Sequence, residues 1–161
     1  MSSTLIPKSQ GREAHVLSGI HPILGGQLLA ALDRLGHGDE LVVADANFPA
    51  HRVGALVIEA PALAAAEVVG AIRTVLPLDA HEGPSVLLMA AEHGVRSAVQ
   101  HELIAAADTT ADRVEQLERF AFYDRATAAQ LVVRTGELRP YGNVVLRKGV
   151  VNEYTPTGAA R

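Results

Sequence analysis

Short runs of apolar residues alternate with stretches of helical periodicity, and this alternation restricts the fold more than any other feature of the chain. The apolar runs that suit strands lie at residues 41–44, 54–58, 85–91, 131–134 and 143–147. Helical spacing occurs at residues 22–35, 63–76, 95–107 and 113–130. A turn at residues 135–137 is expected to join the last two strands. The pattern predicts an α/β fold in which helices are layered on a largely parallel sheet.

Length and composition indicate how much of the chain this fold occupies. The chain has 161 residues, of which 48% are hydrophobic and 20% are charged. Such a chain can bury a sizeable core in one domain. We therefore expect a single compact domain over residues 1–161, with its core at about residues 16–153 and peripheral tails at residues 1–15 and 155–161.

Charge and residue types argue against several classes of partner. The net charge is −4 without a long run of one sign, whereas nucleic-acid and anionic-membrane binders usually carry a basic face. No apolar run approaches the roughly 20 residues of a membrane span, and residues 1–15 lack the apolar segment of a secretory signal. Without cysteine, the chain has no disulfide or thiolate chemistry. We predict a cytoplasmic protein with no nucleic-acid or membrane partner.

Residues 36–51 contain the first candidate site. His37 lies between two glycines, which leave room for close approach of a ligand. Histidine is the side chain that ordinarily changes its charge near neutral pH, which suits proton transfer. Asp45 follows the apolar run at residues 41–44, and ligands usually bind at the carboxyl ends of strands in α/β sheets. The alternative interpretation is structural, with His37 at a helix end and Asp45 in a turn.

Two further segments offer polar side chains. Tyr141, Gly142 and Asn143 follow a proline, and a tight turn is the favoured interpretation, although Tyr and Asn can also bind sugar hydroxyls. Residues 119–125 combine aromatic and charged side chains on a predicted helix. A buried aromatic face with solvated charges is the default there, but Arg119 or Tyr123 could instead face a ligand.

The remaining motifs argue against a metal or nucleotide. Seven histidines occur, yet none forms an HExxH pair. His93 and His101 are about two helical turns apart, too far to share one ion. The chain has no phosphate-binding glycine loop and no nucleophile elbow. We therefore expect no metal, and acid/base chemistry on a neutral polar ligand.

Four segments together resemble the family of L-fucose mutarotase and D-ribose pyranase. They are residues 36–40 (Gly-His-Gly-Asp-Glu), 45–50 (Asp-Ala-Asn-Phe-Pro-Ala), 117–126 and 135–146. They follow the family's order between about residues 19 and 150, and residues 92–112 match least. The segments at 36–40 and 119–123 are more similar to the fucose branch, whereas Pro140 before Tyr141 is more similar to the ribose branch.

The resemblance implies a ribose pyranase/fucose mutarotase-like fold, an isomerase activity, no cofactor, and a homo-oligomer, often a ring, with sites near subunit boundaries. The implied catalytic residue is His37. The implied sugar-binding residues are Asp45, Arg119, Tyr141, Gly142 and Asn143, with Tyr123 and Asp79 as further candidates.

The expected reaction is interconversion of the α and β anomers of L-fucose by ring opening and closure. His37 would move a proton at the anomeric hydroxyl or the ring oxygen. Asp45 would accept hydrogen bonds from hydroxyls, Arg119 would stabilise developing negative charge, and Tyr141 and Asn143 would select stereochemistry. Two alternatives remain, namely pyranose–furanose interconversion of D-ribose, and sugar binding by an oligomer without turnover.

Overall fold

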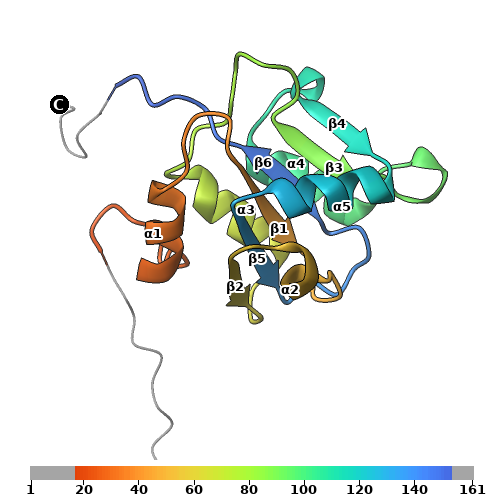
Figure 1. The fold of residues 1–161 in the computed structure, drawn as a ribbon, viewed down its shortest axis with the longest axis horizontal. Coiled ribbons are helices and arrows are strands. Elements are labelled where there is room, and N and C mark those ends of the chain that lie inside the picture. Colours follow the sequence, from red (N-terminus) through yellow and green to blue (C-terminus); the bar gives the residue numbers. More distant parts are fainter. Residues whose placement is uncertain (1–16, 154–161) are drawn as a thin grey trace, which may run out of the picture.

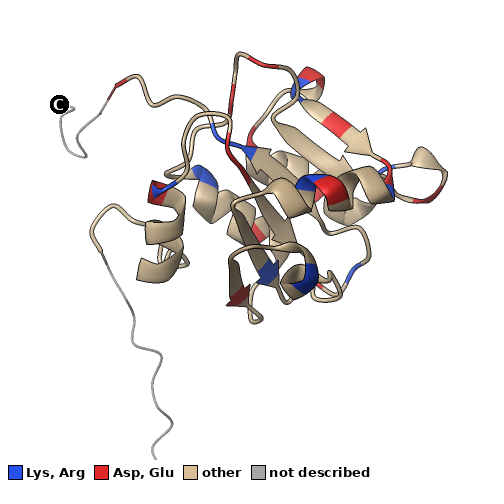
Figure 2. Cartoon of the chain, in the orientation of Figure 1, with Lys and Arg blue, Asp and Glu red and all other residues tan. Residues whose placement is uncertain are grey.

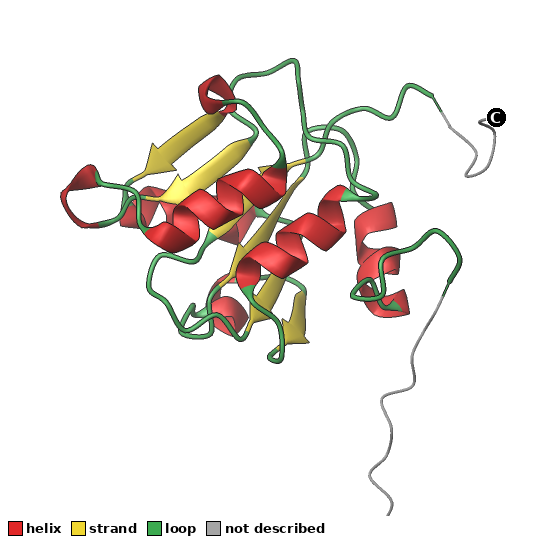
Figure 3. Cartoon of the chain, turned by 180° about the vertical axis from the view of Figure 1, so that it is seen from behind, coloured by secondary structure: helices red, strands yellow, loops and turns green. Residues whose placement is uncertain are grey.

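A six-stranded sheet runs through the middle of the molecule, with helices on both faces (Figures 1 and 3). The computed structural model describes residues 17–153, so the predicted tails at residues 1–15 and 155–161 lie outside the described residues. The strands are β1 (Glu40–Ala44), β2 (Val57–Ala60), β3 (Val86–Met89), β4 (Val114–Leu117), β5 (Leu131–Thr135) and β6 (Val144–Arg147). The helices are α1 (Gly26–Asp33), α2 (Ala50–Val53), α3 (Ala65–Arg73), α4 (Ala98–Ala107) and α5 (Arg119–Ala128), with short 3-10 turns at Glu92–Gly94 and Ala111–Arg113. The predicted α/β architecture is confirmed.

The strand order is β2-β5-β1-β6-β3-β4. The pairs β2–β5, β1–β5 and β3–β4 are parallel, as predicted, whereas β6 is antiparallel to both β1 and β3. In this register Val43 pairs with Val144, and Glu40 pairs with Arg147. The residue that follows β1 therefore lies beside the residue that precedes β6, and this relationship assembles one of the polar clusters described below.

The central strands are buried on both faces, which explains their nearly continuous apolar sequences. Leu41 and Val43 of β1 pack in a core cluster with residues of α1, α3 and α4. Val42 and Ala44 point to the other face and pack with residues of α2 and α5. Each face of the sheet is thus closed by its own layer of helices. Figure 2 shows acidic and basic residues interspersed along the elements that surround this core.

The predicted helix over residues 113–130 is wrong in its first part. Val114–Leu117 form β4, which pairs in parallel with β3 and closes one side of the sheet. The helix begins only after Glu118, whose carboxylate accepts a hydrogen bond of 2.8 Å from the main-chain N–H of Phe120. The apolar positions at Leu117 and Phe120 mimic a helix face, but strand pairing and this N-terminal cap decide the boundary.

Two other predicted connections also differ from the structure. The strand expected at residues 54–58 is displaced to β2, because α2 occupies Ala50–Val53 and Gly54 ends it. A side chain at Gly54 would place its Cβ 2.7 Å from Cγ2 of Val132, so this residue suits a close approach rather than a strand. The turn expected to join β5 and β6 is instead a crossover, because β1 lies between these two strands.

Candidate functional site

Asp45, at the carboxyl end of β1, is bound to Asn143 in front of β6. The Asp45 main-chain N–H donates to Asn143 Oδ1 at 2.9 Å, and Asn143 Nδ2 donates to Asp45 Oδ2 at 2.7 Å. The main-chain N–H of Asn47 donates to the other carboxylate oxygen of Asp45 at 2.9 Å. Asp45 is 6% exposed, and burial raises the pKa of its carboxyl group although these hydrogen bonds oppose the rise. The site therefore holds a buried, oriented carboxylate.

Aromatic side chains and one arginine lie at the same end of β1. The Tyr123 ring packs 5.7 Å from the Phe48 ring, and Tyr123 and Tyr141 both contact the apolar cluster around Phe122. Arg119 Nε donates to the Tyr123 hydroxyl at 3.2 Å, and its guanidinium lies over the Tyr123 ring. That hydrogen bond raises the pKa of Arg119, with Tyr141 contributing in the same direction. We call Asp45, Arg119, Tyr123, Tyr141 and Asn143 the Asp45 cluster.

The turn that carries Tyr141 has an unusual backbone. Tyr141 has a φ of +64°, a left-handed conformation that is costly for a bulky side chain. The neighbouring Gly142 is buried, and a Cβ there would lie 2.7 Å from Cγ of Glu137. The tight turn favoured from the sequence is therefore present, and it also carries Tyr141 and Asn143, two members of the Asp45 cluster.

His37 lies at the other end of β1, in the loop between α1 and β1. Its imidazole is 43% exposed, and Nε2 lies 3.5 Å from Oδ1 of Asp79, in the connection between α3 and β3. The His81 ring lies 6.5 Å from the His37 ring, edge to face. Arg147, at the end of β6, places its Nε 3.7 Å from Oδ2 of Asp79. We call these four residues the His37 cluster.

The Asp79 carboxylate is the buried centre of the His37 cluster, since its side chain is 1% exposed. The main-chain N–H of His81 donates to Asp79 Oδ1 at 2.9 Å and lowers the pKa of the carboxyl group, assisted by His37 and Arg147. Asp79 Oδ2 and Arg147 Nε are buried without a hydrogen bond between them. Asp79 is thus an ionised group that faces the exposed imidazole from inside the protein.

The structure brings most predicted site residues together, but not around His37. The Asp45 cluster contains Asp45, Arg119, Tyr123, Tyr141 and Asn143, whereas His37 and Asp79 lie at the opposite end of β1. This strand has five residues and spans about 13–17 Å, more than the width of one pyranose ring. A single described chain therefore does not surround one sugar with both clusters.

His81, beside His37, and Arg147, beside Asp79, are members of the His37 cluster that sequence reasoning missed. His81 comes from the loop before β3 and Arg147 from the end of β6, so no local motif links either residue to His37. Arg147 reaches the cluster through the pairing of β6 with β1, which sets it opposite Glu40. His81 stands two residues after Asp79 in the sequence, and this proximity is the signal that could have found it.

The described residues hold no group of three or more His, Asp or Glu side chains arranged to bind a metal ion. Within residues 17–153, no helix has both the length and the apolar character that crossing a bilayer requires.

Comparisons with known proteins show what the chain as a whole is similar to. Residues 18–151 match the model of the RbsD / FucU transport protein family. An L-fucose mutarotase of Glaesserella parasuis serovar 5 (strain SH0165) is 44% identical over 140 residues, which cover 84% of this chain and 96% of the relative. The fucose mutarotase of Streptococcus pneumoniae, solved in complex with L-fucose, has a TM-score of 0.78 and 32% identity over 84% of this chain and 99% of that structure. RbsD of Bacillus subtilis, solved with D-ribose, has a TM-score of 0.66 and 25% identity, covering 80% of this chain and 95% of its own.

Proposed function

The chain belongs to the RbsD/FucU family, and we propose that it is an isomerase that interconverts the α and β anomers of L-fucose. The observation that carries the proposal is a histidine backed by a buried carboxylate in a chain that is 44% identical to an L-fucose mutarotase. Polar groups suited to sugar hydroxyls, in the Asp45 cluster, support it further. The fucose-bound structural neighbour is the more similar of the two sugar complexes, by both identity and TM-score.

Anomer exchange needs one proton removed and one delivered. In ring opening, the anomeric hydroxyl loses its proton, the bond between C1 and the ring oxygen breaks, and the ring oxygen gains a proton. The aldehyde then turns about its bond to C2, and closure on the other face reverses the proton transfers. We propose that His37 exchanges one of these protons, because its imidazole is exposed to a ligand.

Asp79 is proposed as the residue that orients His37 rather than as a contact of the sugar. Its carboxylate is buried, and Oδ1 lies on the Nε2 side of the imidazole. A carboxylate in this position favours one ring orientation and stabilises the imidazolium that forms when His37 takes a proton. The low pKa of Asp79 supports this role, since the group stays ionised near neutral pH.

The Asp45 cluster is proposed to bind and polarise the sugar. The Asp45 carboxylate would accept hydrogen bonds from hydroxyl groups, and Arg119 would donate to the oxygen that develops negative charge. Tyr141 and Asn143 would select the hydroxyl configuration, because hydrogen bonds from fixed polar groups discriminate strongly between sugars. Asn143 is 3% exposed and held by Asp45, so its amide has a fixed orientation.

We propose that the complete site forms between two copies of the chain in a homo-oligomer. The support is the separation of the two clusters by the length of β1. Phe120 and Leu138 belong to the two segments that carry Arg119 and Tyr141, namely α5 and the crossover between β5 and β6. Their side chains are 71% and 77% exposed and would suit a subunit contact. The His37 cluster of one copy would then meet the Asp45 cluster of its neighbour. A ring assembly, a cytoplasmic location and a single domain over residues 1–161 stay predictions.

Exchange NMR of anomeric protons tests the proposed activity. L-Fucose, D-ribose and D-galactose are compared with and without the full chain near neutral pH. Faster exchange between the L-fucose anomers supports the proposal. Acceleration of pyranose–furanose exchange in D-ribose alone would move the activity to the ribose reaction. Sugar binding without faster exchange of any of these sugars would favour a binding protein.

A further inference from the structure

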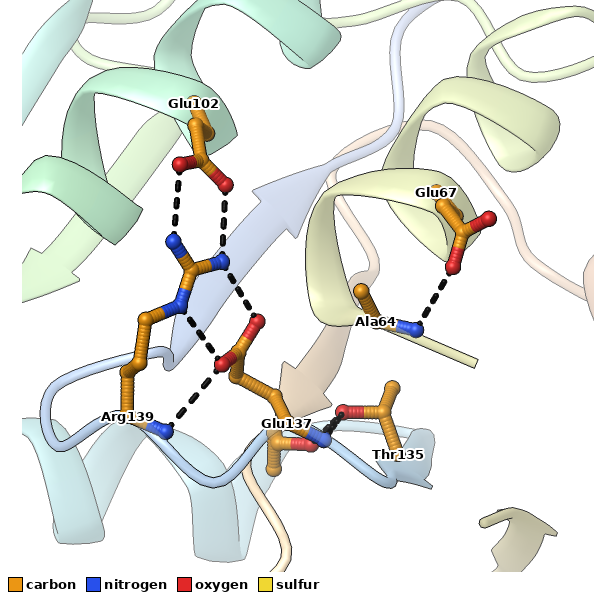
Figure 4. A network of polar contacts seen from close by, with 7 residues as sticks. Ala64, Glu67, Glu102, Thr135, Glu137 and Arg139 are labelled. Carbon is orange, nitrogen blue, oxygen red and sulfur yellow. Dashed lines mark hydrogen bonds and ion pairs between the residues drawn. The ribbon is translucent and has the colours of Figure 1, made fainter. Parts of the chain in front are cut away.

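Arg139 joins two carboxylates that come from different parts of the fold (Figure 4). Its Nε and Nη2 donate to the two oxygens of Glu137 at 2.8 and 2.9 Å. Its Nη1 and Nη2 donate to the two oxygens of Glu102 at 2.7 Å each. Glu102 belongs to α4, whereas Glu137 and Arg139 belong to the crossover between β5 and β6. We call these three residues the Arg139 network.

Glu137 connects the Arg139 network to the end of β1. Its main-chain carbonyl accepts a hydrogen bond of 2.8 Å from the N–H of Ala46, next to Asp45. Its N–H donates to Thr135 Oγ1 at 3.2 Å, and that hydroxyl donates to the carbonyl of Ala44 at 2.8 Å. Glu137 is 5% exposed, so its carboxylate depends on Arg139 for charge compensation.

The same residues support the turn at residues 141–143. The Glu137 side chain lies against Gly142, where a Cβ would be 2.7 Å from Glu137 Cγ and 3.3 Å from the Arg139 carbonyl. Tyr141 keeps its left-handed backbone only because its surroundings impose it. The main-chain N–H of Arg139 also donates to Glu137 Oε1 at 3.1 Å, and this local hydrogen bond fixes the crossover backbone just before the turn.

We infer that Arg139, bound between Glu137 and Glu102, is a positioning residue that holds Tyr141 and Asn143 in the geometry needed to bind the sugar. This inference rests on the proposed function. Exposed ion pairs usually contribute little to stability, but here one partner is buried and the guanidinium is bidentate to both carboxylates. Anchoring to α4 makes the crossover part of a rigid element rather than a free loop.

The kinetic test compares Arg139→Gln with Glu59→Gln in the full chain. Glu59 also pairs with an arginine, Arg134 at 3.0 Å, but both belong to strands rather than to the turn. Arg139→Gln should raise KM for L-fucose by about 10-fold or more with a smaller change in kcat, because the turn binds ground and transition states alike. Glu59→Gln should leave KM unchanged. If the wild type accelerates anomer exchange but the two variants have equal KM values, the inference about Arg139 is wrong while the proposed function stands.

Two further variants separate positioning from misfolding. Glu102→Gln removes only the half-exposed carboxylate on α4, so it should raise KM less than Arg139→Gln does. Arg139→Lys keeps the charge but not the planar fork, and should restore part of the lost affinity. If Arg139→Lys binds sugar as poorly as Arg139→Gln, or if Glu102→Gln raises KM more, the proposed geometry is wrong.

A readout without substrate keeps the inference distinct from the proposed function. The side-chain amide signal of Asn143, in ¹⁵N-labelled full chain, reports its hydrogen bond to Asp45. Arg139→Gln should shift or broaden this signal, whereas Glu59→Gln should not. An unchanged Asn143 signal in Arg139→Gln would refute the positioning role even in a protein that turns over no L-fucose.

Discussion

Asp45 and Asn143 lie 98 positions apart in the chain and are joined by two hydrogen bonds. The Asn143 amide accepts from the Asp45 main-chain N–H and donates to the Asp45 carboxylate. This pairing exists because β6 runs antiparallel beside β1, so that the start of one strand meets the end of the other. It fixes the orientation of a buried carboxylate that would otherwise turn. Several expectations about stability, pH and sugar binding depend on this pair.

Asn143→Ala should destabilise the fold and weaken sugar binding together. The substitution leaves the Asp45 N–H and one carboxylate oxygen without their partner, at a cost of about 1–3 kcal/mol in the free energy of unfolding. Urea denaturation measures this loss. The matched control is Asn47→Ala, because Asn47 is exposed and its hydrogen bond to Asp45 comes from its main chain, which the substitution keeps. Equal stabilities of the two variants would contradict the role of the pair.

Sugar binding should weaken on acidification before an ordinary aspartate would protonate. Burial raises the pKa of Asp45 above 3.8, and the protonated form loses acceptor capacity for sugar hydroxyls. KM for L-fucose should therefore rise as the pH falls toward this raised pKa. Asp45→Asn should have a higher KM that no longer rises in this range. An acid-side rise in KM of the same size in Asp45→Asn would assign the titration to another group.

The contributions of Asp45 and Asp79 to the free energy of unfolding should depend on pH with opposite signs. The folded-state pKa of Asp45 is raised, so its contribution to stability falls as the pH rises through 3.8, where the unfolded chain releases the proton first. The folded-state pKa of Asp79 is lowered, so its contribution is complete above 3.8 and is lost as the pH falls through the folded value.

Urea denaturation between about pH 6 and pH 2.5 tests the second of these signs. The difference in unfolding free energy between wild type and Asp79→Asn should shrink as the pH falls below 3.8. The control is Asp124→Asn, an exposed aspartate on α5, for which the difference should stay small throughout. A difference that grows on acidification would contradict the lowered pKa of Asp79.

Two inactive variants should restore activity when mixed, if sites form between copies of the chain. His37→Ala removes one cluster and Arg119→Ala weakens the other, and both side chains are exposed, so both variants should fold. After subunit exchange at equal amounts, about one quarter of the sites would carry both wild-type residues. Anomer exchange in the mixture should exceed that of either variant alone. No gain, with subunit exchange shown by mass spectrometry, would place the site within one chain.

The sequence was sufficient to predict those parts of the fold that depend on local pattern. The strand at residues 41–44 and the helices within residues 63–76 and 95–107 follow from apolar spacing. β4 was missed because Leu117, Phe120 and Tyr123 recur at helical spacing, while its identity as a strand comes from pairing with β3. Long-range pairing of this kind leaves little trace in a window of a few residues.

The candidate site shows the same division between local and long-range information. His37 and Asp45 are predicted as site residues from their immediate neighbours, and the turn at residues 141–143 is predicted from its residue types. The placement of His37 at the opposite end of β1 from Asp45 depends on the length of one strand. The contact between Asp79 and His37 joins residues 42 positions apart, and no local sequence pattern predicts it.

Exchange NMR of L-fucose with His37→Ala tests the central claim most directly. The control is His51→Ala, because His51 is also an exposed histidine paired with a carboxylate, 2.7 Å from Glu59. We expect His37→Ala to keep the wild-type unfolding transition and to lose about 10²–10⁴-fold in the catalysed exchange rate. His51→Ala should retain the wild-type rate. A folded His37→Ala variant that exchanges the anomers as fast as His51→Ala would contradict the account.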